Sequence, residues 1–455
     1  MSVALSVLPD TARLTLNRLR SAGHEAYLVG GCVRDLIRGV PPGDYDIVTS
    51  ASPAAVRKIF AHTIPVGMSF GVVLVVEGED KYEVATFRRE DGYVDGRRPT
   101  SIILASAEED VRRRDFTING LLLDDETGSL LDYVGGLTDI ERGVLRTIGD
   151  PKQRFAEDHL RMLRAVRFAA YLDYQIDLDT LAAIKVKAGM IRRISAERIR
   201  EELTKIITRS GARRGLELLA ETGLLAEIIP EVAVLNGVEQ PALFHPEGDV
   251  WEHTLKMFDL LPAESEADLR LAWGVILHDV GKAVTRTVDE RGSHFYGHVQ
   301  RGVEIARQIM DRLRFSNEDL ETVLALIRCH MLFMSVREMR PSRLKRFLRM
   351  PDFLLHLELH RLDCLGSHGM LDNYEFCQTK LIEIPAEELR PQRLITGRDL
   401  IEMGFKPGPL FAGILRDMED AQLNGLISTT DDALQRVHER WSAELEKVNN
   451  NFLRR

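Results

Sequence analysis

The sequence lacks the features that mark several specialised classes of protein. Its four cysteines, in 455 residues, show neither CxxC spacing nor the pattern of a disulfide framework. No apolar stretch approaches the roughly 18 residues of a membrane-spanning helix, and the N-terminal segment does not combine basic residues with a long apolar run. Glycine and proline are not enriched, and no segment is of low complexity. These absences predict a globular protein of the reducing cytoplasm that does not associate with membranes.

An excess of positive charge is also missing. The 60 Lys and Arg residues stand against 70 Asp and Glu residues, which gives a net charge of −10. This balance gives no support to a nucleic-acid partner, although proteins that bind nucleic acids often carry their basic charge locally. Local basic clusters do occur, at 185–200, 209–214 and 337–349. Each is either a solvated helix face or part of a groove for RNA.

The pattern of the chain changes near residue 150. Before that point, short segments rich in β-branched or aromatic residues predict strands, with helical patterns between them, and they lie at 26–30, 45–49, 72–76 and 82–87. From Pro151 onward the patterns are almost entirely helical, as in 199–207, where four apolar residues share one helix face. The predicted fold class is therefore α+β, a mixed sheet with helices followed by all-helical parts. A chain of this length predicts two to four domains.

A pair of glycines follows the first predicted strand. Gly30 and Gly31 end that strand, and Arg34 lies in the predicted helix behind them. Glycine lets the backbone approach a triphosphate closely, and the N-terminus of a helix offers free N–H groups to anions. Arg34 would add a charged fork for a phosphate oxygen. Two glycines at the end of a strand are also common in ordinary tight turns.

Two aspartates in the next predicted strand make the interpretation more specific. Asp44 and Asp46 are two residues apart, which in a strand places both carboxylates on one face, roughly 7 Å apart along the strand. Such a pair can hold two Mg²⁺ ions about 3.5–4 Å apart, together with substrate phosphates. Glu83, on the strand predicted at 82–87, could supply a third carboxylate. The alternative is a pair of surface aspartates in a turn.

A series of motifs resembles the family of class II tRNA nucleotidyltransferases and bacterial poly(A) polymerases over about residues 24–230. The motifs are Gly30-Gly31-x-Val33-Arg34-Asp35, Asp44-x-Asp46, Arg113-Arg114-Asp115-Phe116-Thr117-Ile118-Asn119, Asp132-Tyr133-Val134-Gly135-Gly136 through Asp139, Glu157-Asp158-His159-Leu160-Arg161 with Arg164, and Glu197-Arg198-Ile199-Arg200-Glu201-Glu202-Leu203. The resemblance implies a polymerase-β-like palm at 1–150, a helical neck and body at 151–234 for base selection and RNA binding, and a helical tail at 376–455 for RNA binding.

The resemblance also implies a nucleotide site. Arg114 and Asp115 would contact the ribose 2′-hydroxyl and favour an NTP over a dNTP. The other residues expected in this site are Gly31, Arg34, Asn119, Asp158, Arg161, Arg164 and Arg167. The alternative for Arg113 and Arg114 is an ion pair with Glu108, Glu109 or Asp110.

Asp158 and Arg161 predict how the base is chosen. On a helix they would be i,i+3 neighbours on one face. An acid accepts from the amino group of cytosine or adenine while the arginine donates to the adjacent ring nitrogen. Guanine and uracil present the opposite pattern and would leave buried polar groups unpaired. The alternative is a plain salt bridge between Glu157 and Arg161.

The segment Arg88 to Pro99 is polar, strongly charged and punctuated by Gly92 and Gly96. It resembles the flexible loop of this family, which enzymes that add only CC lack and enzymes that add the terminal A possess. The alternative is an ordinary mobile surface loop.

Histidines and aspartates in the helical region at 235–375 resemble an HD phosphohydrolase domain. The residues expected to bind metal are His253, His278, Asp279, His298, His330 and Asp363. Imidazole and carboxylate groups suit one or two divalent ions, including a transition metal, and one ion could activate water for hydrolysis of a phosphoester. Lone histidines are otherwise common in cores and on surfaces.

The sequence therefore favours a tRNA nucleotidyltransferase that adds C and A from CTP and ATP to the tRNA 3′ end. Addition of A alone and poly(A) tailing are alternative products of the same chemistry. A second class of function is an HD phosphohydrolase whose head only binds nucleotide. A third is a non-catalytic RNA-binding module, against which the intact Asp44 and Asp46 argue.

Overall fold

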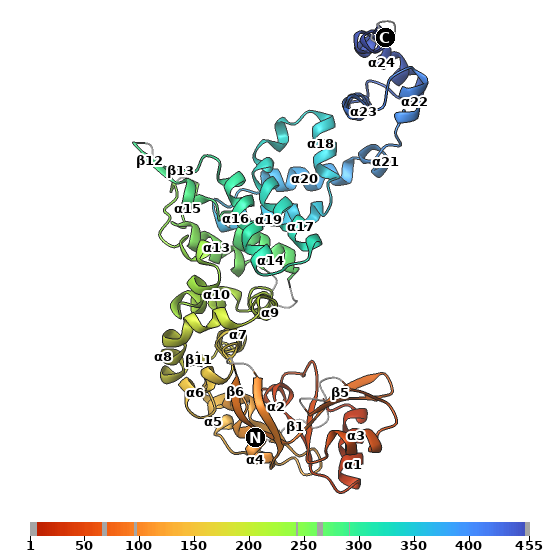
Figure 1. Cartoon of the computed structure of the whole chain (residues 1–455). Coiled ribbons are helices and arrows are strands. Elements are labelled where there is room, and N and C mark those ends of the chain that lie inside the picture. The colour runs from red at the N-terminus through yellow and green to blue at the C-terminus, as the bar shows by residue number, and fades with distance from the viewer. Residues whose placement is uncertain are drawn as a thin grey trace. The chain divides into compact units, whose positions relative to one another are not determined.

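The computed structural model describes residues 7–65, 71–94, 98–242, 244–261, 267–290 and 292–450, without the side chains of 90–102 and 445–450. The chain forms two compact units (Figure 1). The first unit comprises 1–236, 261–273 and 307–316, and the second comprises 237–260, 274–306 and 317–455. Among the described residues, no helix is both long and apolar enough to cross a membrane.

The first unit contains a seven-stranded mixed sheet, with strand order β3-β4-β5-β2-β1-β8-β9. Only β2 and β5 pair in parallel within it, and the other neighbours are antiparallel. The strands are β1 (Ala26–Val29), β2 (Asp46–Thr49), β3 (Thr63–Ile64), β4 (Val72–Glu77), β5 (Asp80–Thr86), β8 (Leu121–Leu123) and β9 (Leu130–Asp132). The sheet and the helices around it confirm the predicted α+β class.

Helices α1 (Asp10–Ser21), α2 (Gly31–Ile37), α3 (Pro53–Ile59) and α4 (Ala107–Arg112) accompany this sheet. Helix α4 begins where Ser106 and Glu109 form a reciprocal capping box. Buried apolar side chains pack α4 against β1, β2 and β8, and they are Val29, Val48, Phe87, Ala107, Val111 and Leu122. This core fixes the ends of the strands that carry the candidate site.

The segment predicted as a loop at Arg88 to Pro99 instead belongs to a β-hairpin. Strands β6 (Arg88–Val94) and β7 (Arg98–Leu104) pair antiparallel from Arg88 opposite Leu104 to Val94 opposite Arg98. Residues 95–97, part of the predicted loop, lie outside the described residues. Three β-branched residues, Thr100, Ile102 and Ile103, favour a strand here, and this strand gives the charged segment a partner.

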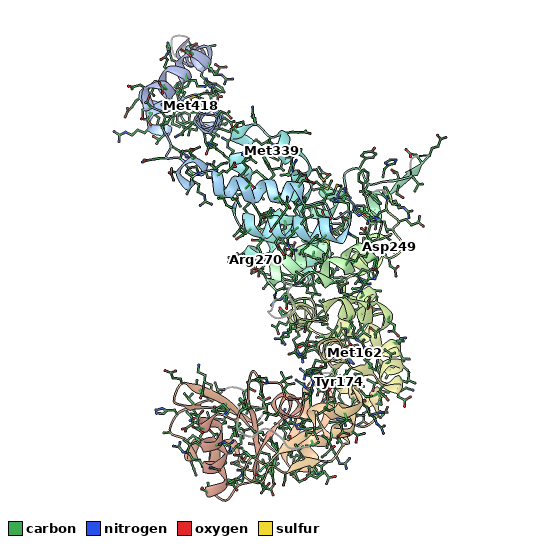
Figure 2. The ribbon with its side chains drawn as sticks, turned by 180° about the vertical axis from the view of Figure 1, so that it is seen from behind. Met162, Tyr174, Asp249, Arg270, Met339 and Met418 are labelled. Carbon is green, nitrogen blue, oxygen red and sulfur yellow. The ribbon has the colours of Figure 1, made fainter. Side chains whose placement is uncertain are left out.

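The rest of the first unit is mainly helical, as predicted. Its helices are α5 (Gly136–Arg142), α6 (Pro151–Glu157), α7 (Arg161–Leu172), α8 (Leu178–Lys187), α9 (Ala196–Ile207), α10 (Ala212–Glu221), α11 (Leu224–Ile228) and α12 (Pro230–Ala233). Asp150 caps α6 through the Lys152 amide, with Pro151 in the first position. Met162 of α7 and Tyr174 beyond it, both labelled in Figure 2, are buried. Helix α9 buries the predicted apolar face around Ile199 and Leu203.

The second unit is helical except for the hairpin of β12 (Thr287–Asp289) and β13 (Gly292–His294). The helices that lie in or enter it are α13 (Val250–Asp259), α14 (Leu269–Leu277), α15 (Lys282–Thr285), α16 (His298–Arg312), α17 (Asn317–Cys329), η5 (His330–Glu338), α18 (Pro341–Leu348), α19 (Phe353–Gly366), α20 (Asp372–Glu383), α21 (Ala386–Leu389), α22 (Gly397–Glu402), α23 (Pro409–Leu423) and α24 (Thr430–Asn450). A core around Phe333, Phe347 and Phe353 is separate from the core around Phe405 and Met418 at the C-terminal end.

Candidate functional site

A pocket of about 670 Å³ opens in the first unit beside the ends of β1 and β2. Most residues predicted to bind nucleotide or metal in this unit line it, namely Gly31, Arg34, Asp44, Asp46, Arg114, Asp115, Asn119, Arg164 and Arg167. Asp158 and Arg161 are not among its lining residues. Residues up to 136 positions apart in sequence therefore meet in one place.

Three carboxylates lie near one another at this pocket. Strand β2 begins at Asp46, so Asp44 precedes the strand, and the prediction that both residues lie within it was wrong for Asp44. Both still line the same pocket. Ile47 pairs with Val84 in the parallel register of β2 and β5, which places Glu83 beside Asp46. Burial, with the charges of Asp44 and Glu83, raises the pKa of Asp46 to about 6, against the opposing effect of Arg114. A bound cation would relieve this repulsion.

Gly30 lets the side chains of Asp46 and Arg114 lie close to the backbone at the pocket. Gly30 has φ of 80°, a conformation that favours glycine, and a Cβ there would lie 3.7 Å from an Asp46 carboxylate oxygen and 3.9 Å from an Arg114 nitrogen. A side chain at residue 30 would therefore project between the acidic group and Arg114.

Arg34 is buried and already has partners. Its guanidinium donates to both oxygens of Asp35 at 2.9 and 3.0 Å and to Asn119 Oδ1 at 2.9 Å. These contacts hold the side chain in one orientation at the pocket wall. The predicted phosphate-binding arginine is thus positioned by a neighbour in its own motif and by a residue 85 positions later.

Asp115 is the acceptor that holds several neighbouring side chains of the pocket in place. Its Oδ2 accepts from Arg164 Nε and Nη2 at 2.9 and 2.6 Å, and its Oδ1 accepts from the Phe116 amide and Asn119 Nδ2. Burial alone would raise the pKa of Asp115, but Arg164 outweighs it and lowers that pKa to about 2. The carboxylate is therefore ionised at neutral pH. Its roughly four acceptor positions are all used, so a ribose hydroxyl would have to displace one donor.

Sequence reasoning did not single out Phe168, Tyr171, Arg209 and Ser210, which also line the pocket. Phe168 lies beneath three guanidinium groups, with ring-to-Cζ distances of 5.5, 5.3 and 4.3 Å for Arg34, Arg164 and Arg167. The spacing of 164, 167, 168 and 171 matches one face of a helix, so helical periodicity could have found Phe168 and Tyr171.

Residues of two other motifs hold side chains of this pocket in place. Glu202, which lies in the motif 197–203, is buried and accepts from Arg167 Nε at 2.7 Å. Asp139 Oδ2 accepts from Thr117 Oγ1 at 2.7 Å, which holds the turn that carries Asn119. These residues place side chains that line the pocket and do not line it themselves.

Asp158 does not lie on a shared helix face with Arg161, so this prediction was wrong. Asp158 is the extended residue that ends α6, and its carboxylate pairs with Arg198 at 3.2 Å. Arg161 begins α7 and pairs with Glu157 at 2.8 Å, which is the salt bridge named as the alternative. The break between α6 and α7 falls at Asp158, because its side chain accepts from the Leu160 amide instead of continuing the helix.

Arg113 and Arg114 also form the ion pairs expected of the alternative. Both pair with Asp110, at 2.7 and 3.0 Å. Arg114 nevertheless lines the pocket and lowers the pKa of Asp46, so the ion pair and a role in the pocket coexist.

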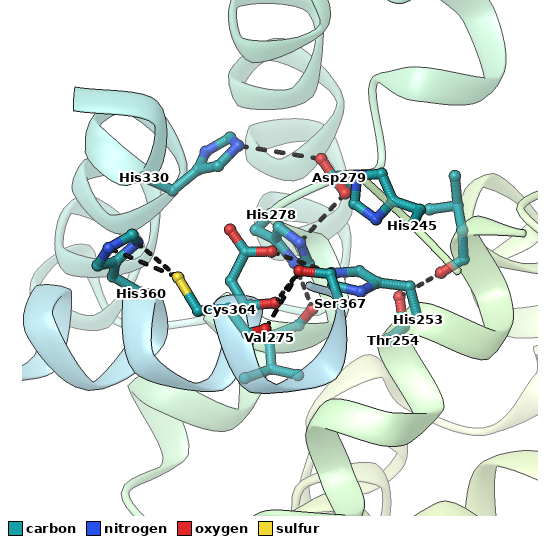
Figure 3. Close-up of polar contacts among 12 residues, drawn as sticks. His245, His253, Thr254, Val275, His278, Asp279, His330, His360, Cys364 and Ser367 are labelled. Carbon is teal, nitrogen blue, oxygen red and sulfur yellow. Dashed lines mark hydrogen bonds and ion pairs between the residues drawn. The ribbon is translucent and has the colours of Figure 1, made fainter. Parts of the chain in front are cut away.

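A second candidate site lies in the second unit. The six residues predicted to bind metal come together there, and Figure 3 shows His253, His278 and His330 around Asp279. His253 Nε2 lies 3.2 Å from Asp363, and His278 Nε2 lies 3.2 Å from Asp279. The other Asp279 oxygen lies 3.8 Å from His298 Nε2 and 3.9 Å from His330 Nε2.

This centre fits divalent cations. The Nε2 atoms of His253, His278 and His298 are buried and have no hydrogen-bond partner within the described residues. Two ligand groups share Asp279, one with His253 and His278 and the other with His298 and His330. Burial opposes ionisation, but Lys282 and His278 hold the pKa of Asp279 well below its usual range. Burial lowers the pKa of His330 to about 4, so this imidazole is neutral and able to ligate.

Domain families match the chain in the order of these sites. A poly A polymerase head domain matches residues 26–146, a probable RNA and SrmB-binding site of polymerase A matches 173–235, and an HD domain matches 250–354. The sheet, the acidic pocket and these matches define a nucleotidyltransferase with a polymerase head and an HD-type domain.

Proteins of similar sequence and structure identify the family within the nucleotidyltransferases. A CCA-adding enzyme of Streptococcus sanguinis is 31% identical over 420 residues, which is 92% of this chain and 94% of that protein. One of Limosilactobacillus fermentum is 45% identical over 216 residues, and that match spans 54% of its length. The structure of the Bacillus stearothermophilus CCA-adding enzyme in complex with CTP is similar with a TM-score of 0.71 and 28% identity, over 98% of each chain. The chain belongs to the family of CCA-adding enzymes.

Proposed function

We propose that this enzyme adds C and A from CTP and ATP to the 3′ end of tRNA without a nucleic-acid template. The observation that carries the proposal is the acidic group of Asp44, Asp46 and Glu83 beside a wall of arginines in one open pocket. In the reaction the tRNA 3′-oxygen bonds to the α-phosphorus, the bond to the β-phosphate oxygen breaks, and pyrophosphate leaves. The direct assay offers each NTP alone and in mixture to tRNA that lacks its 3′ end.

Asp44 and Asp46 would hold two Mg²⁺ ions in this site. Such ions, bound by these carboxylates, would supply a lower pKa for the attacking hydroxyl and positive charge for the leaving pyrophosphate. Gly30 and Gly31 leave room for the triphosphate, and Arg34 and Arg167 supply positive charge along its path. We assign the ribose to Arg114 and Asp115, with Asp115 holding Arg164 and Asn119 in place.

Asp158 and Arg161 would select the base. Changing either to alanine should raise incorporation of UTP and GTP relative to CTP and ATP by roughly ten- to a hundredfold, because a donor or acceptor that discriminates is lost. Triphosphate binding should change less, since the residues assigned to it lie in the pocket. Steady-state incorporation of each NTP measures both effects.

The control for this prediction is Lys152→Ala, an exposed change on α6. Its selectivity should equal that of the unchanged enzyme. Unchanged selectivity in both the Asp158→Ala and the Arg161→Ala enzymes would reduce the two residues to structural ion pairs.

The β6–β7 hairpin would control the change from C to A. Its first residue is linked to the base-selecting region, because Arg113 Nε donates to the Arg88 carbonyl at 3.0 Å and Arg161 donates to the Arg113 carbonyl at 3.1 Å. Deleting residues 92–98 should preserve C addition and sharply reduce terminal A addition. The measurement is product length on tRNA that ends before the first C.

The same assay separates the alternative products. The intact enzyme should add three nucleotides and stop. Incorporation of A alone, and only on a CC end, would identify an A-adding enzyme, and a long ladder of A on unrelated RNA would identify a poly(A) polymerase. Equal loss of C and A addition in the deletion would refute the role of the hairpin.

The HD-type region would supply a second activity, metal-dependent hydrolysis of a phosphoester. The observation that favours it is the set of buried Nε2 atoms around Asp279 that form no hydrogen bond within the described residues but lie near carboxylates. The mixed imidazole and carboxylate ligands suit a divalent transition metal.

We also propose how the chain is divided and where it acts. Residues 1–150 would form the catalytic head, 151–234 the neck and body, 235–375 the metal-binding domain and 376–455 a tail that binds tRNA.

Within the basic cluster 337–349, Arg346 and Arg349 pair with Glu419, whereas Arg340 and Arg343 are exposed and available to phosphates. The cytoplasm, where four free thiols stay reduced, would be the site of action.

A further inference from the structure

A carboxylate without an assigned role lies beside the metal centre. The side chain of Glu247 has no exposed surface, and its Oε1 lies 2.8 Å from His245 Nδ1 and 2.9 Å from His253 Nδ1. Its Oε2 is buried and has no hydrogen-bond partner in the part of the chain that the structure describes. Burying an ionised carboxylate costs free energy unless it is paired, and the two imidazoles are the groups that can compensate the charge of Glu247.

The other histidines of the centre are oriented differently. His278, His298 and His330 each place Nδ1 within hydrogen-bonding distance of the carbonyl oxygen three residues earlier, at 2.9, 2.9 and 2.7 Å. A carbonyl can only accept, so Nδ1 carries the proton and Nε2 is left for a cation. Backbone geometry thus sets the tautomer of these three rings.

His253 has a carboxylate in place of that carbonyl. Its Nδ1 lies 2.9 Å from Glu247 Oε1 and its Nε2 lies 3.2 Å from Asp363, both as ion-pair contacts that do not have hydrogen-bond geometry. The centroid of the His278 ring is 5.5 Å from that of His253. A carboxylate partner makes an imidazole a more basic ligand than a carbonyl partner does, and it also fixes the ring. His245 forms a hydrogen bond with the same Glu247 oxygen, and the centroid of its ring lies 5.2 Å from that of His253, so it helps to hold the carboxylate at His253.

We propose that Glu247 is a positioning residue that makes the two metal positions of this centre unequal. The position formed by His253, His278, Asp279 and Asp363 then binds a divalent cation more tightly than the position formed by Asp279, His298 and His330. This inference rests on the metal centre proposed above and adds an order of affinity within it.

The experiment is a Co²⁺ titration of the full-length, metal-stripped enzyme, followed by calorimetry and by visible absorption. The unchanged enzyme should bind two ions in two resolved steps. Glu247→Gln keeps the shape of the side chain and removes its charge, and it should weaken the tighter step by about ten- to a hundredfold. The weaker step should keep its dissociation constant.

Two further variants show which metal position gives each binding step and whether the effect is specific to Glu247. His298→Ala removes a ligand of the second position only, so it should abolish the weaker step and leave the tighter one. Glu239→Gln is the matched control, because Glu239 lies on the same segment but pairs with Arg286, away from the centre. It should bind both ions as the unchanged enzyme does.

The outcomes separate this inference from the metal centre itself. Two unaltered steps in Glu247→Gln, or equal weakening of both, would overturn the role of Glu247 and leave the centre standing. An unchanged enzyme that binds no ion would overturn both. If Glu247→Gln is less stable without metal, the rise of its melting temperature with Co²⁺ still reports the affinity, because that rise depends on the dissociation constant.

Discussion

Replacing Asp44 or Asp46 with alanine should lower nucleotide incorporation by roughly a thousandfold or more, because each carboxylate would carry part of a charge stabilisation of several kcal/mol. The fold should be retained. Burial and neighbouring acids raise the pKa of Asp46, so removing one acid relieves repulsion in the metal-free protein. The measurement is the initial rate of labelled CTP and ATP incorporation into tRNA that lacks its 3′ end, with the melting temperature recorded alongside.

The matched control for this result is Asp80→Ala. Asp80 is an exposed acid at the start of β5 that accepts a hydrogen bond from Thr11 and does not line the pocket. Its variant should incorporate nucleotides at the unchanged rate. An Asp44→Ala or Asp46→Ala enzyme that retains a near-normal rate would show that these residues do not hold the catalytic ions.

The double replacement His278→Ala/Asp279→Ala should remove bound transition metal from the enzyme and abolish phosphoester hydrolysis, while tRNA extension continues. Asp279 contributes to both ligand groups, so its loss disrupts both positions. The acidic pocket lies in the other compact unit and shares no residue with this centre. Metal content by mass spectrometry and the two activities, measured on the same full-length preparation, test the expectation.

His294→Ala serves as the control for the double replacement. His294 lies in the same unit and pairs with Asp289, outside the centre. It should retain full metal content. A double variant that keeps its metal, or that loses tRNA extension while remaining folded, would contradict the independence of the two sites.

The sequence was most informative where a short motif carries its own geometry. Asp44 and Asp46 meet in one pocket because a single residue separates them, and His278 and Asp279 are adjacent in the chain. The helical face that bears Phe168 is also encoded in the sequence, because Arg164, Arg167, Phe168 and Tyr171 lie at helical spacing.

The sequence was least informative about partners chosen by packing. Asp158 pairs with Arg198, forty residues later on α9, and no local sequence pattern predicts that ion pair. Glu247 lies six residues before His253, where a helix periodicity would not place them together. Its position depends on how the segment before α13 folds back, which Asp249 fixes by capping that helix and accepting from the Gly237 amide.

If Asp158 and Arg161 select the base as proposed, their separate ion pairs would make that selection an exchange of partners. In the free enzyme Arg198 satisfies Asp158, and Glu157 satisfies Arg161. A cytosine or adenine that bridges the two residues offers both a replacement at once, so the new hydrogen bonds compensate for the old ones. A guanine or uracil offers neither, and the two ion pairs simply persist. Rejection of the wrong base would then need no steric clash, because the enzyme's own side chains compete with it for the reading positions.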